Sequence, residues 1–324
     1  MNKYVAKKSI VNVFKASETI INKNLQGYAK PDYSKPLQFG AYHTDHMLEI
    51  DWCKKSGWSK PQINPWHNLS LDPRNSALHY AISLFEGMKA YKGIKDSNEL
   101  YLFRPELNMI RMNHSAERVG LPEFNGEELI KCIEKLLLVD KDWIREEKGY
   151  SVYIRPTYMS ISDVLGVSPA EKAKIFVIMS PVGPYFTSGY TALSLICNDN
   201  DYLRSFPGGF GERKLAANYG PTLQKYKQCL DQGYNQVLWL VNDNITECGV
   251  MNFFALIKDK NGQQELVTSN LDGTVLPGVT RRSILDLASS WGIKTSERQF
   301  SIHELIECYE NDRVRMLLIN KLIQ

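Results

Sequence analysis

The sequence predicts an α+β fold with two domains, and three observations support this class. Segments with helical periodicity and segments with strand periodicity occur in both halves of the chain. Most of the predicted strands are joined by short turns of the hairpin kind, which favours α+β over a doubly wound parallel sheet. A stretch containing Pro and Gly, residues 180–189, divides the chain near its middle.

The first half contains two predicted helices followed by two predicted strands. Apolar residues recur at helical spacing from Pro105 to Val119 and again from Gly126 to Trp143. Residues Ser151 to Ser160 alternate as a strand does, and the apolar run from Ile175 to Met179 is a strand that leads into the linker.

Two further helices are predicted in the second half. One opens at Gly220-Pro221 and closes at Gly233, and its apolar positions are Leu223, Tyr226 and Leu230. The other has Thr280 as its N-cap and ends at Gly292.

The second half also contains two predicted strands, Gln236 to Val241 and Met251 to Ile257. They are joined through Asn242-Asp243-Asn244. The pair Asn261-Gly262 is a strong hairpin signal after the second strand.

Composition bounds the possible functions. The 324 residues are 43% hydrophobic and 23% charged, with a net charge of +3, as in soluble globular proteins. This charge gives no reason to expect nucleic acid or a membrane as partner, and no apolar run reaches membrane-spanning length. The six cysteines show no metal-ligand spacing, so we expect reduced thiols and no metal. Met1 to Lys15 is basic and free of acidic residues, as in a mitochondrial presequence, but it lacks arginine, so we expect a cytoplasmic protein with a mitochondrial one as the alternative.

The segment from Gly208 to Tyr219 is the most informative for function. It places Lys214 between a glycine-rich loop and a predicted helix start. Glu247 follows in a strand-like run, and Val279-Thr280 lies at the start of a helix, where free N–H groups bind phosphate readily. Pyridoxal phosphate chemistry requires such an amine, phenol, carboxylate and helix N-terminus.

Each of these residues also has a purely structural interpretation. Lys214 alone can be a surface lysine, Glu247 an exposed hairpin residue, and Val279-Thr280 an ordinary capped helix start. A nucleotide-binding phosphate loop is excluded, because it requires Gly before the lysine and Ser or Thr after it. Arg111, on a predicted helix, can extend its charge to solvent or, if buried, bind a pair of phosphate oxygens.

The order of these segments resembles the branched-chain amino acid aminotransferases, a fold-type IV pyridoxal phosphate family. The resemblance runs from about Val13 to Arg315. The matched blocks are Phe39-Gly40, Thr44-Asp45-His46-Met47, Ala77-Leu78-His79-Tyr80, Leu84-Phe85-Glu86-Gly87, Leu102-Phe103-Arg104-Pro105, Tyr153-Ile154-Arg155-Pro156, Pro181-Val182-Gly183-Pro184-Tyr185 and Leu276-Pro277-Gly278-Val279-Thr280-Arg281.

The resemblance implies a role for each matched position. Lys214 resembles the lysine that forms the Schiff base and then moves a proton at the substrate Cα. Tyr219 resembles the tyrosine that hydrogen-bonds the cofactor's phenolic oxygen, and Glu247 the partner of its pyridine nitrogen. The implied phosphate ligands are Arg111, Val279 and Thr280, and the implied substrate pocket consists of Phe39, Tyr80, Phe85, Tyr153, Arg155 and Tyr185.

The implied reaction is amino transfer from leucine, isoleucine or valine to 2-oxoglutarate. An aromatic-walled pocket suits all three side chains, because one methylene changes binding by only about 1–3 kcal/mol. The implied architecture is that of D-amino acid aminotransferase, with a smaller N-terminal domain (1–180), an interdomain loop (181–189) and a larger cofactor-binding domain (190–324). The implied partners are amino and 2-oxo acids and a second copy of the chain, in a homodimer.

The sequence departs from the family after about Arg315. Members continue into a Ser/Ala-Gly-Thr-Ala segment, whose backbone amides contact the phosphate and the substrate carboxylate, and then into further strands and a closing helix. We therefore expect an incomplete C-terminal domain. The alternative function is a truncated, catalytically impaired form that only dimerises or binds the cofactor. A D-amino acid aminotransferase or aminodeoxychorismate lyase is the same-fold alternative, and the blocks at 39–47 and 181–185 argue against both.

Overall fold

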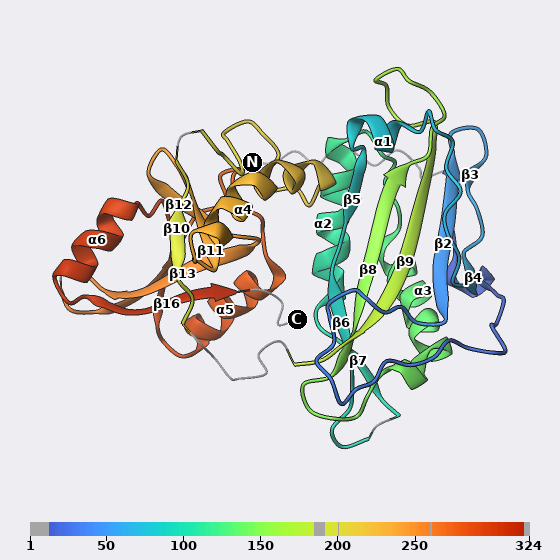
Figure 1. The fold of residues 1–324 in the computed structure, drawn as a ribbon, viewed down its shortest axis with the longest axis horizontal. Coiled ribbons are helices and arrows are strands. Elements are labelled where there is room, and N and C mark those ends of the chain that lie inside the picture. The colour runs from blue at the N-terminus through green and yellow to red at the C-terminus, as the bar shows by residue number, and fades with distance from the viewer. Residues whose placement is uncertain (1–12, 97, 185–191, 200, 260, 321–324) are drawn as a thin grey trace. The chain divides into compact units, whose positions relative to one another are not determined.

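The computed structural model describes residues 13–96, 98–184, 192–199, 201–259 and 261–320 (Figure 1). The chain separates into two compact units, residues 1–183 and 184–324. Most of the basic N-terminal segment and residues 185–189 of the linker lie outside the described residues. The first unit is the longer of the two in this chain. The domain boundaries implied by the family resemblance (1–180, 181–189 and 190–324) stay a prediction.

The first unit is built on one mixed sheet, in the order β1-β4-β2-β9-β8-β6-β7, with β3 paired to β2 and β5 to β8. The long strands β2, β9 and β8 pair antiparallel at its centre. The strands are β1 (Ile20–Ile21), β2 (His46–Cys53), β3 (Gly57–Trp58), β4 (Gln62–Pro65), β5 (Ser83–Phe85), β6 (Met88–Lys92), β7 (Leu100–Leu102), β8 (Ser151–Ser160) and β9 (Lys172–Val182).

The helices of this unit are α1 (Ser76–Tyr80), α2 (Pro105–Arg118) and α3 (Gly126–Val139), with 3-10 turns at Ala16–Glu18 and Lys141–Trp143. The two predicted long helices are confirmed, although α3 ends earlier than Trp143. Asn125 caps α3, because its side chain accepts from the first backbone N–H groups. The helix stops at Asp140, whose carboxylate accepts from the backbone N–H and the ring of His46 at 3.0 and 2.6 Å.

The core of the first unit lies between its helices and its sheet. The helix α3 buries Leu129, Ile133 and Leu136, and it packs against β2, where Leu48 and Ile50 are fully buried. This apolar stripe at helical spacing is what predicted the helix. The strand β8 has the predicted bounds and is buried along most of its length.

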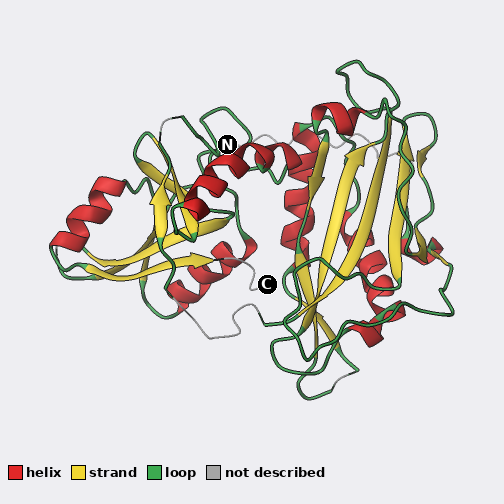
Figure 2. Cartoon of the chain, in the orientation of Figure 1, coloured by secondary structure: helices red, strands yellow, loops and turns green. Residues whose placement is uncertain are grey.

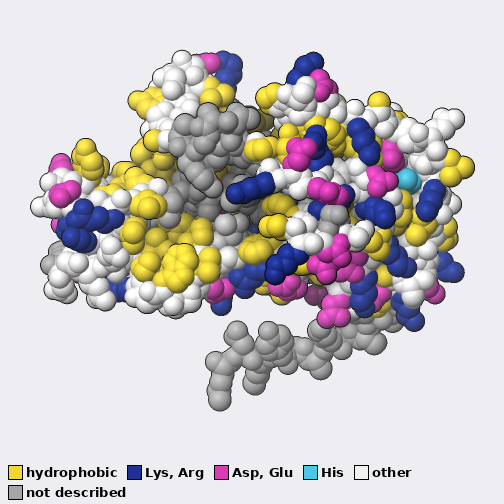
Figure 3. Space-filling model, turned by 90° about the horizontal axis from the view of Figure 1, so that it is seen from below, with side chains coloured by type: hydrophobic (Ala, Val, Ile, Leu, Met, Phe, Trp, Pro, Cys, Tyr) yellow, Lys and Arg dark blue, Asp and Glu magenta, His cyan; other side chains and the backbone are white. Residues whose placement is uncertain are grey.

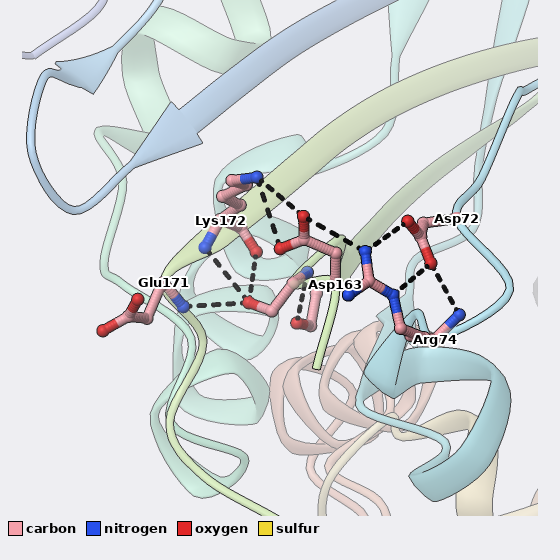
Figure 4. A network of polar contacts seen from close by, with 7 residues as sticks. Asp72, Arg74, Asp163, Glu171 and Lys172 are labelled. Carbon is pink, nitrogen blue, oxygen red and sulfur yellow. Dashed lines mark hydrogen bonds and ion pairs between the residues drawn. The ribbon is translucent and has the colours of Figure 1, made fainter. Parts of the chain in front are cut away.

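A network of hydrogen bonds and ion pairs links the β8–β9 connection to the loop before α1 (Figure 4). The side chain of Arg74 binds Asp72 at 2.9 and 3.0 Å and approaches Asp163 at 4.0 Å. Lys172 bonds Asp163 at 3.3 Å. The hydrogen bonds of Arg74 hold the pKa of Asp72 at about 2. Because these groups are largely exposed, solvent screens the network, and it contributes little stability.

The second unit has a smaller sheet in the order β10-β11-β12-β13-β14-β15, with β16 paired to β13. Its strands are β10 (Leu195–Cys197), β11 (Gln236–Val241), β12 (Asn244–Cys248), β13 (Met251–Lys258), β14 (Gln264–Thr268), β15 (Lys294–Glu297) and β16 (Val314–Asn320). The predicted strands β11 and β13 and the hairpin at Asn261-Gly262 are confirmed. The turn at Asn242-Asp243 leads into β12, which lies between β11 and β13 in the sheet.

The helices of the second unit are α4 (Leu223–Asp231), α5 (Val279–Ser290) and α6 (Ile302–Glu310), with 3-10 turns at Ala216–Asn218 and Gly220–Thr222 (Figure 2). The predicted apolar face of α4 is wrong. Leu223 and Leu230 are 64% and 49% exposed, whereas Cys229 and the stem of Lys225 are buried. A long lysine stem packs as an apolar chain when its charge has a partner, here Asp199 at 2.8 Å.

The sheet of the second unit has apolar clusters on both faces. On one face α5 packs through Leu285 and Ala288 against Phe254 and Leu266. The other cluster includes Phe253, Ile257 and Phe300, together with residues of α6. The tail for which the sequence predicted an incomplete domain forms β16, which pairs antiparallel with β13.

The described surface shows no dominant charge of one sign on the face in Figure 3. Lys and Arg side chains alternate there with Asp and Glu over the first unit. Among the described residues, no helix is both long and apolar enough to cross a bilayer. Within the same residues, no group of three His, Cys, Asp or Glu side chains is arranged to hold a metal ion. The six cysteines are all free thiols.

Candidate active site

The structure brings Lys214 and Tyr219 together at one turn of the second unit. The Lys214 amine donates to the Tyr219 hydroxyl at 3.4 Å. The turn is fixed by Asn218, whose buried side-chain amide donates to the carbonyls of Phe210 and Arg213 at 3.0 and 2.7 Å. These two hydrogen bonds anchor Phe210 and Arg213 to Asn218, which lies between Lys214 and Tyr219 in the chain. They therefore hold the amine and the phenol at a defined separation.

Glu247 lies on β12 and is 1% exposed, so the interpretation as an exposed hairpin residue is wrong. Its Oε1 accepts from the Leu276 N–H at 2.7 Å and from the Asn252 amide at 3.3 Å. Burial raises the pKa of the neighbouring Cys248 thiol to about 12. A carboxylate buried this far from water destabilises the fold unless it is paired with a cation.

The start of α5 differs from the sequence prediction. The N-cap is Gly278, and Thr280 is already inside the helix. No side chain caps this end, so the first-turn N–H groups lack the usual side-chain acceptor. Gly278 is required here, because a Cβ would lie 2.1 Å from Oδ1 of the buried Asn252 side chain. The hydrogen bond from Leu276 brings Glu247 close to this helix start.

Arg111 lies in the first unit, on α2, and its side chain is only 8% exposed. Its Nε and one terminal nitrogen donate to the two oxygens of Glu86 at 2.7 Å each. Glu86 is fully buried and also accepts from the Asn108 amide at 2.8 Å. The interpretation of Arg111 as an arginine that extends to solvent is therefore wrong. The paired hydrogen bonds to Glu86 fix the plane of the Arg111 guanidinium.

Four of the predicted substrate residues form one cluster in the first unit. The rings of Phe39 and Tyr153 meet edge to face at 4.9 Å. The guanidinium of Arg155 lies 4.6 Å from the Phe85 ring centre and donates to the Tyr153 hydroxyl at 3.0 Å. Gly87 leaves room for the Tyr153 hydroxyl, because a Cβ at position 87 would lie 2.2 Å from it.

A cavity of about 330 Å³ adjoins this cluster. Phe39, Tyr153 and Arg155 line it, together with a stacked pair of rings, His43 and Trp66, whose centres are 3.9 Å apart. Its size and aromatic walls, with one cationic group, suit a small apolar molecule that carries a carboxylate.

The contacts of this cluster do not include Tyr80, and Tyr185 is not among the described residues. Tyr80 ends α1, and its hydroxyl donates to the Leu165 carbonyl in the β8–β9 connection. Both stay predictions.

Three supporting residues were missed by the sequence analysis. In the sequence Glu86 stands out only as part of a matched block, and Arg204 and Asn252 have no distinguishing local pattern. Each is a buried polar residue that binds a predicted site residue. Buried charges are recognisable only from their partners, which are distant in sequence.

The donor set of the second unit fits pyridoxal phosphate. It offers a partly exposed amine, a phenol 3.4 Å from it, a buried carboxylate and a helix start without a side-chain cap. In that order, these groups are suited to bind the aldehyde, the phenolic oxygen, the protonated ring nitrogen and the phosphate of the cofactor.

The family model for class IV aminotransferases matches residues 83–311. The branched-chain-amino-acid aminotransferase of Dictyostelium discoideum is 46% identical over 317 residues, which cover 97% of this chain and 82% of that protein. The cytosolic enzyme of Mus musculus is 46% identical, over 94% of this chain and 79% of its own. The mitochondrial enzyme of Rattus norvegicus is 44% identical, over 93% and 77%.

Solved structures with the same fold include two branched-chain amino acid aminotransferases. The Thermobaculum terrenum structure, in its PLP form, superimposes with a TM-score of 0.67 at 18% identity, over 86% of this chain and 83% of that one. The Escherichia coli structure gives a TM-score of 0.66 at 22% identity, over 85% and 83%.

Proposed function

This chain belongs to the branched-chain amino acid aminotransferases, within the class IV family, and we propose that Lys214, Tyr219 and Glu247 carry its chemistry. It is a pyridoxal phosphate-dependent transaminase of branched-chain amino acids with the fold-type IV architecture. The observation that carries this function is the 46% identity over 97% of the chain.

When bound, pyridoxal phosphate supplies an aldehyde that takes up the amino group and a ring that draws electrons from the substrate Cα. The Lys214 amine holds the cofactor and then moves a proton at that Cα. Tyr219, whose hydroxyl lies 3.4 Å from the amine, would hydrogen-bond the phenolic oxygen of the cofactor. Glu247 holds the ring nitrogen in its protonated form.

The first N–H groups of α5, at Val279 and Thr280, would hold the phosphate, and we propose Arg111 as a further phosphate ligand. We propose that the substrate side chain packs against Phe39, Phe85 and Tyr153, and Tyr80 and Tyr185 stay proposed pocket residues on the family resemblance alone. Arg155 orients the carboxylate. The amino group passes to 2-oxoglutarate in the second half-reaction.

We infer a homodimer in the cytoplasm, with the mitochondrion as the alternative compartment. The relatives include cytosolic and mitochondrial forms. Light scattering of the purified protein tests the quaternary state, and a mass of one chain, 37.1 kDa, would contradict it. A form that only dimerises or binds the cofactor is not favoured, because relatives of 43 to 49% identity carry the enzyme's name.

The decisive experiment is the visible absorbance of the protein with pyridoxal phosphate, before and after leucine is added. We expect a protein-bound band that leucine converts to the pyridoxamine form. Borohydride reduction followed by peptide mass mapping should place the cofactor on Lys214. Lys227→Ala, an exposed lysine on α4, is the matched control and should keep the adduct. The assignment fails if Lys214→Ala keeps the same reducible adduct.

A further inference from the structure

A second buried charge accompanies Glu247. Arg204 lies on the loop that leads to Lys214, and its side chain is 3% exposed. One terminal nitrogen lies 2.8 Å from Glu247 Oε2, and the other donates to the Thr274 carbonyl at 3.3 Å. The pair is shielded from water, because the Glu247 side chain is 1% exposed.

Both oxygens of Glu247 are thereby engaged. Oε1 accepts from Leu276 and Asn252, and Oε2 faces Arg204. These three partners come from three different segments of the chain. A guanidinium beside a buried carboxylate favours the ionised form and fixes its plane.

The segment that carries Arg204 is itself packed tightly. A Cβ at Gly211 would lie 2.5 Å from the side chain of Ser205 and 2.6 Å from the Thr274 carbonyl oxygen. The Glu212 N–H donates to the Gly273 carbonyl at 3.0 Å. The same loop therefore sets the position of Arg204 and, a few residues later, that of Lys214.

We propose that Arg204 is a positioning residue, which holds Glu247 ionised and oriented toward the ring nitrogen of the cofactor before the cofactor binds. The proposal rests on the proposed role of Glu247. Without Arg204 the buried carboxylate takes up a proton more readily and loses its fixed orientation. Arg204 thus acts on the cofactor through Glu247.

The test is the dissociation constant of pyridoxal phosphate for the apoprotein, measured by absorbance titration. Arg204→Met should weaken binding at least tenfold at neutral pH. Arg204→Lys keeps the charge but loses the planar fork, and it should recover part of the loss. Lys225→Met removes another buried cation of this unit, paired with Asp199, and as the control it should leave the affinity unchanged.

The pH profile separates this role from a structural one. Between pH 8 and 5.5 the affinity of the Arg204→Met variant should fall on acidification, because Glu247 then becomes neutral at a higher pH. The profile of the Lys225→Met variant should follow that of the unmodified protein.

A double-mutant cycle decides the outcome. In a Glu247→Gln background, Arg204→Met should cause no further loss of affinity, because the group on which Arg204 acts is already neutral. Equal fold losses in both backgrounds, or no loss in either, would overturn the proposal. If Arg204→Met does not fold, Arg204→Lys is judged by the same cycle. If Glu247→Gln alone leaves affinity and absorbance unchanged, the proposed role of Glu247 fails instead.

Discussion

The 3.4 Å separation of the Lys214 amine and the Tyr219 hydroxyl predicts the effect of removing one oxygen. Tyr219→Phe should lower the turnover of leucine about 10- to 100-fold, the equivalent of one hydrogen bond to a charged group, about 1.5–3 kcal/mol. The thermal midpoint should hardly change, since the ring remains. Tyr226→Phe on α4 is the control. An unaffected turnover would contradict the role of the phenol.

A pH effect on stability is expected from Glu49 on β2. Burial raises the pKa of Glu49, but hydrogen bonds from Lys174, Asn64 and His67 outweigh this effect. They lower the pKa from 4.5 to about 2. A depressed pKa contributes stability above pH 4.5 that is lost as the pH falls toward 2. The stabilisation is at most about 3 kcal/mol.

Glu49→Gln should therefore reduce the difference in unfolding free energy between pH 7 and pH 2.5 by up to about 3 kcal/mol, as measured by denaturant titration. Asp72→Asn is the contrasting control. Its pKa is also about 2, but that carboxylate is exposed and screened by solvent. Equal effects of the two substitutions would contradict the argument from burial.

At the scale of elements, the start of α5 depends on one glycine. A Cβ at position 278 would lie 2.1 Å from the Asn252 side chain, whose amide bonds Glu247 and the Leu276 carbonyl. Gly278→Ala should weaken cofactor binding at least tenfold and lower the thermal midpoint. Gly220→Ala, where no atom lies within 4 Å, should do neither. The prediction fails if the two variants bind pyridoxal phosphate alike.

The elements also show how far periodicity predicts structure. The bounds of β8 and α2 follow from local pattern, because each element repeats its apolar residues along its length. The buried face of α4 does not follow from local pattern, since Leu223 is exposed and Lys225 is buried. The start of α5 was misplaced because Thr280 resembles a cap, whereas packing against Asn252 selects Gly278.

For the whole molecule, cofactor binding should appear as stability. A ligand at one hundred times its dissociation constant adds about 2.7 kcal/mol to the free energy of unfolding. Pyridoxal phosphate should therefore raise the midpoint of thermal unfolding of the full chain. Lys214→Ala should lose most of this increase, and Lys227→Ala should keep it. An equal increase in both variants would show that Lys214 does not hold the cofactor.

The sequence by itself determined the fold class, the helices α2, α3, α4 and α5, the strands β8, β9, β11, β12 and β13, and the candidate residues Lys214, Tyr219 and Glu247. These follow from periodicity, turn residues and motif order, which are local properties of the chain. Only the tertiary structure decided that Glu247 and Arg111 are buried and that Arg204 and Glu86 are their counter-ions. Such pairs join residues 25 to 43 positions apart, and burial makes their partnership necessary.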